Sequence, residues 1–156
     1  MAAVGYKVQS ASNALTASAT RTVVGAKAHA NSGLQVKKWG VSFDGSAAAA
    51  GIQVQLCYVT FATNAPGTNS TTTNAVVQEY GRVLTAGFTG AYHWTSEPTT
   101  VTVLENKYIQ QSGAYEWAVP LGQEPDCALG EGFAVRIITP AAVTPNYVAF
   151  LGVERV

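Results

Sequence analysis

The amino-acid sequence predicts an all-β chain, an antiparallel β-sandwich of jelly-roll type with about eight or nine strands. Short runs of alternating apolar and polar residues recur along it, separated by Gly, Pro, Asn and Thr, as in half-buried strands joined by turns. No segment carries the apolar stripe of a long amphipathic helix. The chain has 156 residues, 47% of them hydrophobic, which is enough for one domain with its own core.

The strongest strand signals are runs in which one face is apolar. In residues 51–61, Ile52, Val54 and Leu56 alternate with polar or small side chains. Similar runs occupy residues 115–119, 133–139 and 146–154, and the last is apolar on both faces, which is typical of a central or interface strand. Weaker strands are expected over residues 21–24, 76–80, 82–84 and 100–104.

Residues 34–43 also form a predicted strand, but their alternation changes parity. The apolar residues have even numbers up to Val36 and odd numbers from Trp39 onwards. A slip of one residue turns every following side chain to the other face, so either a β-bulge lies near Lys37 and Lys38 or the strand passes between two packing environments. We favour the bulge.

The domain organisation predicted from the sequence is one sandwich over residues 21–156, preceded by an arm over residues 1–20. The arm is rich in Ala, Ser and Thr and has no strong periodicity. Such a segment either frays or becomes ordered only against a neighbouring subunit. On this hypothesis its deletion leaves the fold intact and weakens binding to a partner.

The charge balance excludes several classes of partner. Charged residues make up 12% of the chain, and nine acidic and nine basic residues cancel. Without a basic excess we expect no binding to nucleic acid or to an anionic membrane surface. The first residues lack the pattern of a secretory signal peptide, so synthesis in the cytoplasm is expected, with Cys57 and Cys127 as reduced thiols.

Residue types that perform catalysis or bind metals are sparse and scattered. A triad of Cys57, His93 and Asp44 has no support in their spacing, and the acidic residues between 116 and 131 lie mostly in turns. Zinc spacing, a calcium loop and phosphate-binding motifs are not found in the sequence. We therefore expect that the chain is not an enzyme and needs no cofactor or metal.

Two loops stand out. Residues 63–74 are polar, uncharged and rich in turn formers, which predicts an exposed, mobile loop or a plain connector. Residues 85–98 carry Tyr92, His93 and Trp94, with two glycines before them and Pro98 after them. Consecutive aromatic residues form a stacking platform for a sugar, a contact for a partner chain, or simple packing over one end of the sandwich, and the sequence leaves these open.

Five short segments stand out for their motifs: residues 38–45 (KWGVSFDG), 120–125 (PLGQEP), 132–137 (GFAVRI), 140–143 (PAAV) and 148–154 (VAFLGVE). Together they resemble a group of small β-sandwich proteins from tailed phages and prophage-like clusters. The resemblance runs from about Leu34 to the last residue. It implies a virion structural protein, and specifically a capsid decoration or auxiliary protein that coats a shell of major capsid protein as a homotrimer. A tail or fibre component is the other location that the resemblance allows.

Four aromatic residues have few obvious partners within the chain and are candidates for the oligomer interface, because closed assemblies bury such residues at their symmetry axis. They are Trp39, Phe43, Tyr147 and Phe150. The alternative is that all four lie inside the sandwich.

The competing functional hypothesis is a carbohydrate- or surface-binding module. In it the rings of Tyr92, His93 and Trp94 stack on a sugar, and amide side chains of residues 63–74 supply hydrogen bonds. Stacking needs no net charge, so the composition does not exclude it.

Overall fold

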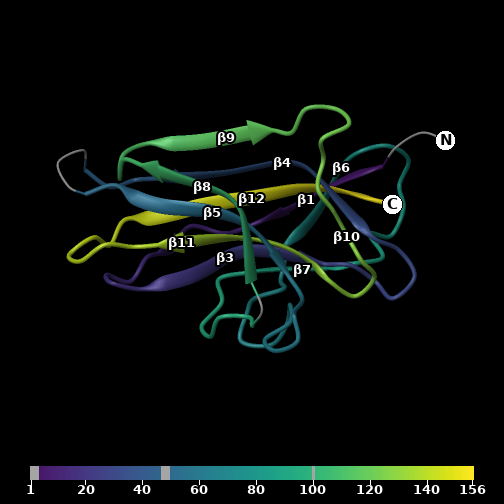
Figure 1. Ribbon diagram of the computed structural model, residues 1–156, viewed down its shortest axis with the longest axis horizontal. Coiled ribbons are helices and arrows are strands. Elements are labelled where there is room, and N and C mark those ends of the chain that lie inside the picture. The colour runs from purple at the N-terminus through teal and green to yellow at the C-terminus, as the bar shows by residue number, and fades with distance from the viewer. Residues whose placement is uncertain (1–3, 47–49, 100) are drawn as a thin grey trace.

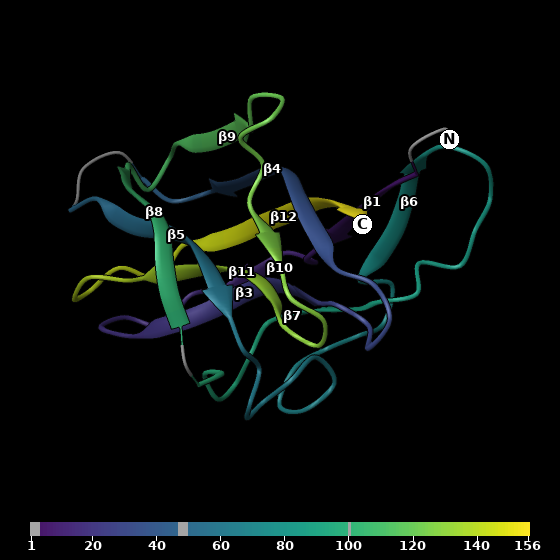
Figure 2. The same cartoon turned by 45° about the vertical axis from the view of Figure 1, so that its right-hand side comes forward.

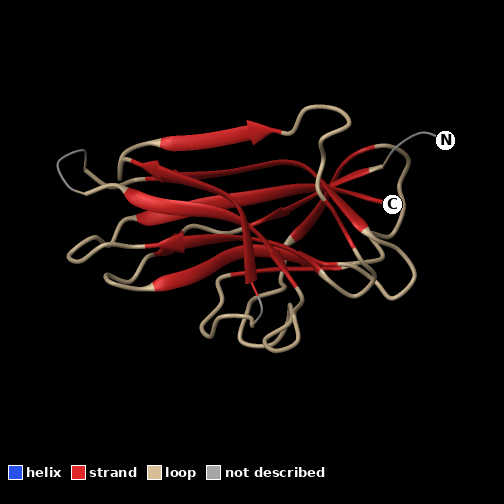
Figure 3. Ribbon diagram, viewed as in Figure 1, coloured by secondary structure: helices blue, strands red, loops and turns tan. Residues whose placement is uncertain are grey.

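The computed structural model describes residues 4–46, 50–99 and 101–156, and all regular structure in these residues is β-strand (Figure 3). Two antiparallel sheets pack face to face (Figure 1), which confirms the predicted β-sandwich. None of the described residues belongs to a helix of the length and apolarity needed to cross a membrane.

The larger sheet, sheet A, has seven strands. These are β1 (Gly5–Gln9), β2 (Asn13–Ala14), β4 (Leu34–Phe43), β6 (Val76–Tyr80), β9 (Ala114–Ala118), β10 (Asp126–Cys127) and β12 (Asn146–Arg155). Its order is β10-β4-β12-β1-β6, with β9 also paired to β4 and β2 to β12. Strands from both ends of the chain therefore form its centre.

The second sheet, sheet B, has five strands in the order β7-β3-β11-β5-β8. These are β3 (Thr20–Lys27), β5 (Ile52–Val59), β7 (Thr89–Tyr92), β8 (Val101–Ile109) and β11 (Gly132–Ile138). The main core fills the space between the two sheets.

The described residues form twelve strands rather than eight or nine. Every predicted strand overlaps an observed one except residues 82–84, which follow a turn that the side-chain amide of Gln78 closes by donating to the backbone carbonyls of residues 80–82. The strands that were not predicted are β1 and the short β2, β7 and β10. Thr100 of predicted strand 100–104 and residues 1–3 of the predicted arm lie outside the described residues.

The predicted bulge near Lys37 is confirmed. Gly152 pairs with Lys38 and Val153 pairs with Val36, so Lys37 is an extra residue in β4. The bulge keeps the apolar side chains before and after it on the interior face, although their numbers differ in parity.

The structure differs from the predicted arm over residues 1–20. Strand β1 lies between β12 and β6 in sheet A (Figure 2), and the side chains of Tyr6 and Val8 are 3% and 0% exposed. The Ser10 hydroxyl accepts a hydrogen bond from the Ala149 N–H at 2.8 Å. The sandwich therefore includes residues before 21, because the partners of β1 come from distant parts of the chain and hold it in the sheet.

A second, smaller core lies on the outer face of sheet B. Its buried members are Cys57, Val59, Phe61, Ala91, Trp94 and Ala134. Cys57 and Cys127 are both unpaired, as predicted, and burial raises the pKa of the Cys57 thiol to about 11. That thiol is a packed side chain rather than a nucleophile.

Candidate functional site

The structure does not place the Tyr92–His93–Trp94 segment as an open aromatic platform. The side chain of Trp94 is 1% exposed, and its ring stacks on Phe61 with 6.2 Å between centroids. The indole N–H donates to the Asn64 carbonyl at 2.7 Å. Trp94 therefore fills the second core, and only half-buried Tyr92 and His93 reach solvent.

Residues 63–74 form a loop that hydrogen bonds hold against residues 92–95, rather than the mobile loop that the sequence predicts. The backbone of Thr71 exchanges two hydrogen bonds of 2.9 Å with Tyr92, and the Thr95 N–H donates to the Asn69 carbonyl at 2.8 Å. The Asn69 amide in turn donates to the Asn64 side-chain oxygen at 2.8 Å. The asparagines expected to bind a sugar here support the loop itself and the indole of Trp94.

His93, the residue after β7, contacts side chains of β3 and β12 through its two ring nitrogens. Its Nε2 lies 3.2 Å from Nη1 of Arg21, and its Nδ1 lies 3.0 Å from the hydroxyl of Tyr147. Because a guanidinium only donates, Nε2 accepts, and the neutral ring carries its proton on Nδ1, from which it donates to Tyr147. Burial, with the Arg21 charge as a smaller cause, lowers the pKa of His93 below its ordinary value of 6.5.

A pH dependence of stability follows from His93. The unfolded chain binds a proton at this residue more tightly than the folded chain, so the His93 contribution to stability is complete above pH 6.5 and is lost as the pH falls below it. We expect His93→Asn, which tolerates the positive φ of 56° at this position, to flatten the fall of the melting temperature between about pH 7.5 and 5.5.

The matched control for this pH experiment is His29→Asn, at an exposed histidine. We expect it to leave the pH profile of the wild type unchanged. Equal slopes for the wild type and His93→Asn would contradict the assignment of a neutral, buried His93.

Three of the four residues predicted for the oligomer interface lie inside the sandwich. Trp39, Phe43 and Tyr147 are 0%, 7% and 0% exposed, which is the alternative that the sequence left open. The indole N–H of Trp39 donates to Glu105 at 3.1 Å, and the hydroxyl of Tyr115 donates to the other oxygen of the same carboxylate at 2.6 Å. These hydrogen bonds join the edge strand β8 to sheet A.

Phe150 differs from the other three because it lies on the outer face of sheet A and is only half-buried. Its ring lies directly over Gly40, where a Cβ atom would approach it to 2.6 Å. The stem of Lys38 covers Gly152 in the same way, and its ammonium lies 5.9 Å from the centre of the Phe150 ring. The two glycines therefore let both side chains lie flat on the sheet.

The surface around Phe150 is partly apolar, and we call it the sheet A face. By the register of β6, β1, β12, β4 and β9, the side chains on this face include Val77, Lys7, Gln9, Lys38, Ser42, Ala114, Glu116, Ala118, Val148 and Phe150. Val148 is 45% exposed and Val77 is 41% exposed. Glu79 joins the face to its surroundings through contacts of 3.0 Å to Lys38 and 3.7 Å to Lys7.

Sequence reasoning missed Val77 and Val148 as members of this surface. Their exposure on one face depends on the pairing of β6 with β1 and of β12 with both neighbours, and no local pattern reports it. Within the described ranges no group of three or more His, Cys, Asp or Glu residues is arranged to hold a metal ion.

Comparison of the chain with protein-family models, with curated proteins and with solved structures finds no match.

Proposed function

We propose that the chain is a non-enzymatic structural protein of a phage particle, a capsid decoration protein that self-associates and coats the head. The single observation that supports this best is the sheet A face, on which exposed Val148 and half-buried Phe150 follow each other along the outward side of β12. Contiguous exposed apolar surface on a small protein marks a site of association.

The resemblance to phage sandwiches supports the same surface. Segments 38–45 and 148–154 are distant in the sequence, yet they lie on β4 and β12 and pair with each other in sheet A. Together they supply Lys38, Phe150 and Val148 to the sheet A face. Two of the segments that carry the resemblance therefore contribute to the surface that we propose for self-association.

A second copy of this chain is the occupant that the charges favour. The face carries Lys7, Lys38 and Glu116 and is bordered by Glu79, so positive and negative groups lie beside the same apolar side chains. A surface with both signs can match a copy of itself in a closed assembly. We take the homotrimer and the head location from the resemblance, with a tail or fibre as the other location.

The carbohydrate-module hypothesis loses its main support at the Tyr92–His93–Trp94 segment. A stacking platform needs an exposed ring, and the Trp94 ring is enclosed between Phe61 and the sheet. We therefore do not propose sugar binding as the function of that segment.

The proposal predicts that Phe150→Ala dissociates the oligomer and preserves the fold. Truncation of a central interface aromatic typically costs about 2 kcal/mol or more, which weakens association at least about 30-fold. The measurement is absolute mass by light scattering at two concentrations about tenfold apart, together with the melting temperature, and mixing with undecorated phage heads tests the location.

Tyr108→Ala is the matched control, because Tyr108 is 75% exposed on sheet B. It should retain the mass of the wild type. A wild type that stays monomeric at both concentrations, or equal loss of mass in both variants, would overturn the proposed assembly.

A further inference from the structure

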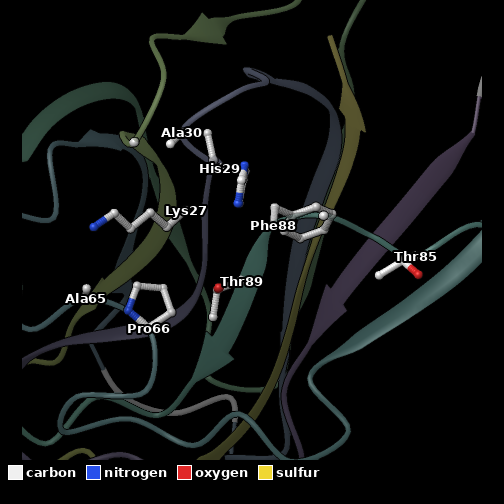
Figure 4. Close-up of a pocket in the computed structure, with 11 residues that line it drawn as sticks. Lys27, His29, Ala30, Ala65, Pro66, Thr85, Phe88 and Thr89 are labelled. Carbon is white, nitrogen blue, oxygen red and sulfur yellow. The ribbon is translucent and has the colours of Figure 1, made fainter.

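A groove of about 620 Å³ opens at one end of the sandwich and shares no residue with the sheet A face. It lies where β3 ends, beside the segment that precedes β7, and its volume is typical of sites for small molecules. Figure 4 shows side chains from three separate segments around this space. Those that the argument uses are Lys27, His29, Pro66, Thr85, Phe88 and Thr89.

In the part of the chain that the structure describes, Lys27 is the one lining residue of the groove that carries a full charge at neutral pH. Lys27 and His29 line it, and no acidic residue does so among the residues that the structure describes. The guanidinium of Arg155 does not line the groove but lies 2.5 Å from the place that a Cβ atom on the lining residue Gly87 would occupy. In a chain of zero net charge this is a local positive site, suited to an anionic group.

The rest of the lining is apolar or carries hydroxyl groups. Phe88 is half-buried, and its ring is held from behind by an edge contact with Tyr6, with 5.5 Å between centroids. Pro66 contributes a second apolar surface, and Thr85 and Thr89 are exposed residues with hydroxyl groups. Such a lining fits a ring with an apolar face and several hydroxyl groups.

We propose that this groove binds an acidic sugar, a pyranose that carries a carboxylate. The carboxylate interacts with Lys27 and His29, the C–H face of the ring packs on Phe88, and hydroxyl groups exchange hydrogen bonds with the threonines. An inorganic anion would leave the Phe88 surface uncovered, and a neutral sugar would leave Lys27 without a counter-charge. The site does not depend on the proposed assembly function.

The test is a titration of the full chain with sodium glucuronate, followed by ¹H–¹⁵N nuclear magnetic resonance. We expect a dissociation constant on the order of 1 mM, with shifts concentrated at residues 27–30 and 85–89. Glucose should bind at least about tenfold more weakly, and inorganic phosphate should not shift the signal of Phe88.

Lys27→Met, which keeps the aliphatic stem, should lower the affinity for glucuronate to that for glucose. His29→Asn, at an exposed position outside the strands, should weaken binding as well. The matched control is Lys107→Met on β8, at a lysine whose side chain is 49% exposed and lies outside the groove; it should bind as the wild type does.

Three results of the titrations with the wild type would overturn the proposal. They are the absence of binding up to about 50 mM glucuronate, equal affinity for glucuronate and glucose, and a shift of Phe88 with phosphate as large as that with glucuronate. Equal losses in Lys27→Met and Lys107→Met would show a general charge effect and would overturn it too.

Discussion

Replacement of Trp94 by alanine is expected to lower the free energy of unfolding by about 3–5 kcal/mol. The ring is 1% exposed, stacks on Phe61 and packs against Gly25, where a Cβ atom would lie 3.1 Å from it. The variant also leaves the Asn64 carbonyl without the indole donor. Denaturant unfolding monitored by circular dichroism measures the loss.

The matched control is Trp117→Ala on β9, where the side chain is 43% exposed. We expect it to cost less than about 1 kcal/mol, because a surface substitution leaves no enclosed space empty. If both tryptophan variants lost equal stability, Trp94 would not be the centre of a second core. A Trp94 that served only as a ligand platform would lose binding and keep its stability.

The strands that the sequence predicted best are those whose burial follows from local alternation. In β5 and β11, one face packs into the main core, so apolar residues recur every second position and the signal lies within the strand itself. The bulge at Lys37 was predictable for the same reason, since a change of parity within one strand is also a local feature.

The position of Phe150 could not be predicted in this way. Strand β12 is apolar on both faces, and its alternation alone does not tell which face is interior. The partners decide: Tyr147 pairs with Phe43 and faces inward, whereas Phe150 pairs with Gly40 and faces outward. The location of Trp94 was equally hidden, because its cover is a loop with no periodicity.

Val8→Asp is expected to prevent folding, in contrast to the behaviour of a flexible arm. Val8 is 0% exposed in β1, its strand pairs on both sides, and a buried carboxylate would have no partner in the main core. The free-energy cost of burying an unpaired carboxylate is comparable to or larger than the whole net stability of a domain, about 5–15 kcal/mol. The absence of a cooperative melting transition is the expected result.

The matched control is Lys7→Ala, which removes an outward-facing side chain of the same strand and leaves the main core unchanged. Lys7 faces outward and lies 3.7 Å from Glu79 with both side chains partly exposed, so its loss should cost no more than about 1 kcal/mol. A folded, cooperative Val8→Asp would show that residues 5–9 are dispensable, as the arm hypothesis requires. If Val8→Asp does not fold and Lys7→Ala folds normally, the sandwich requires its N-terminal segment, because β1 joins β6 to β12.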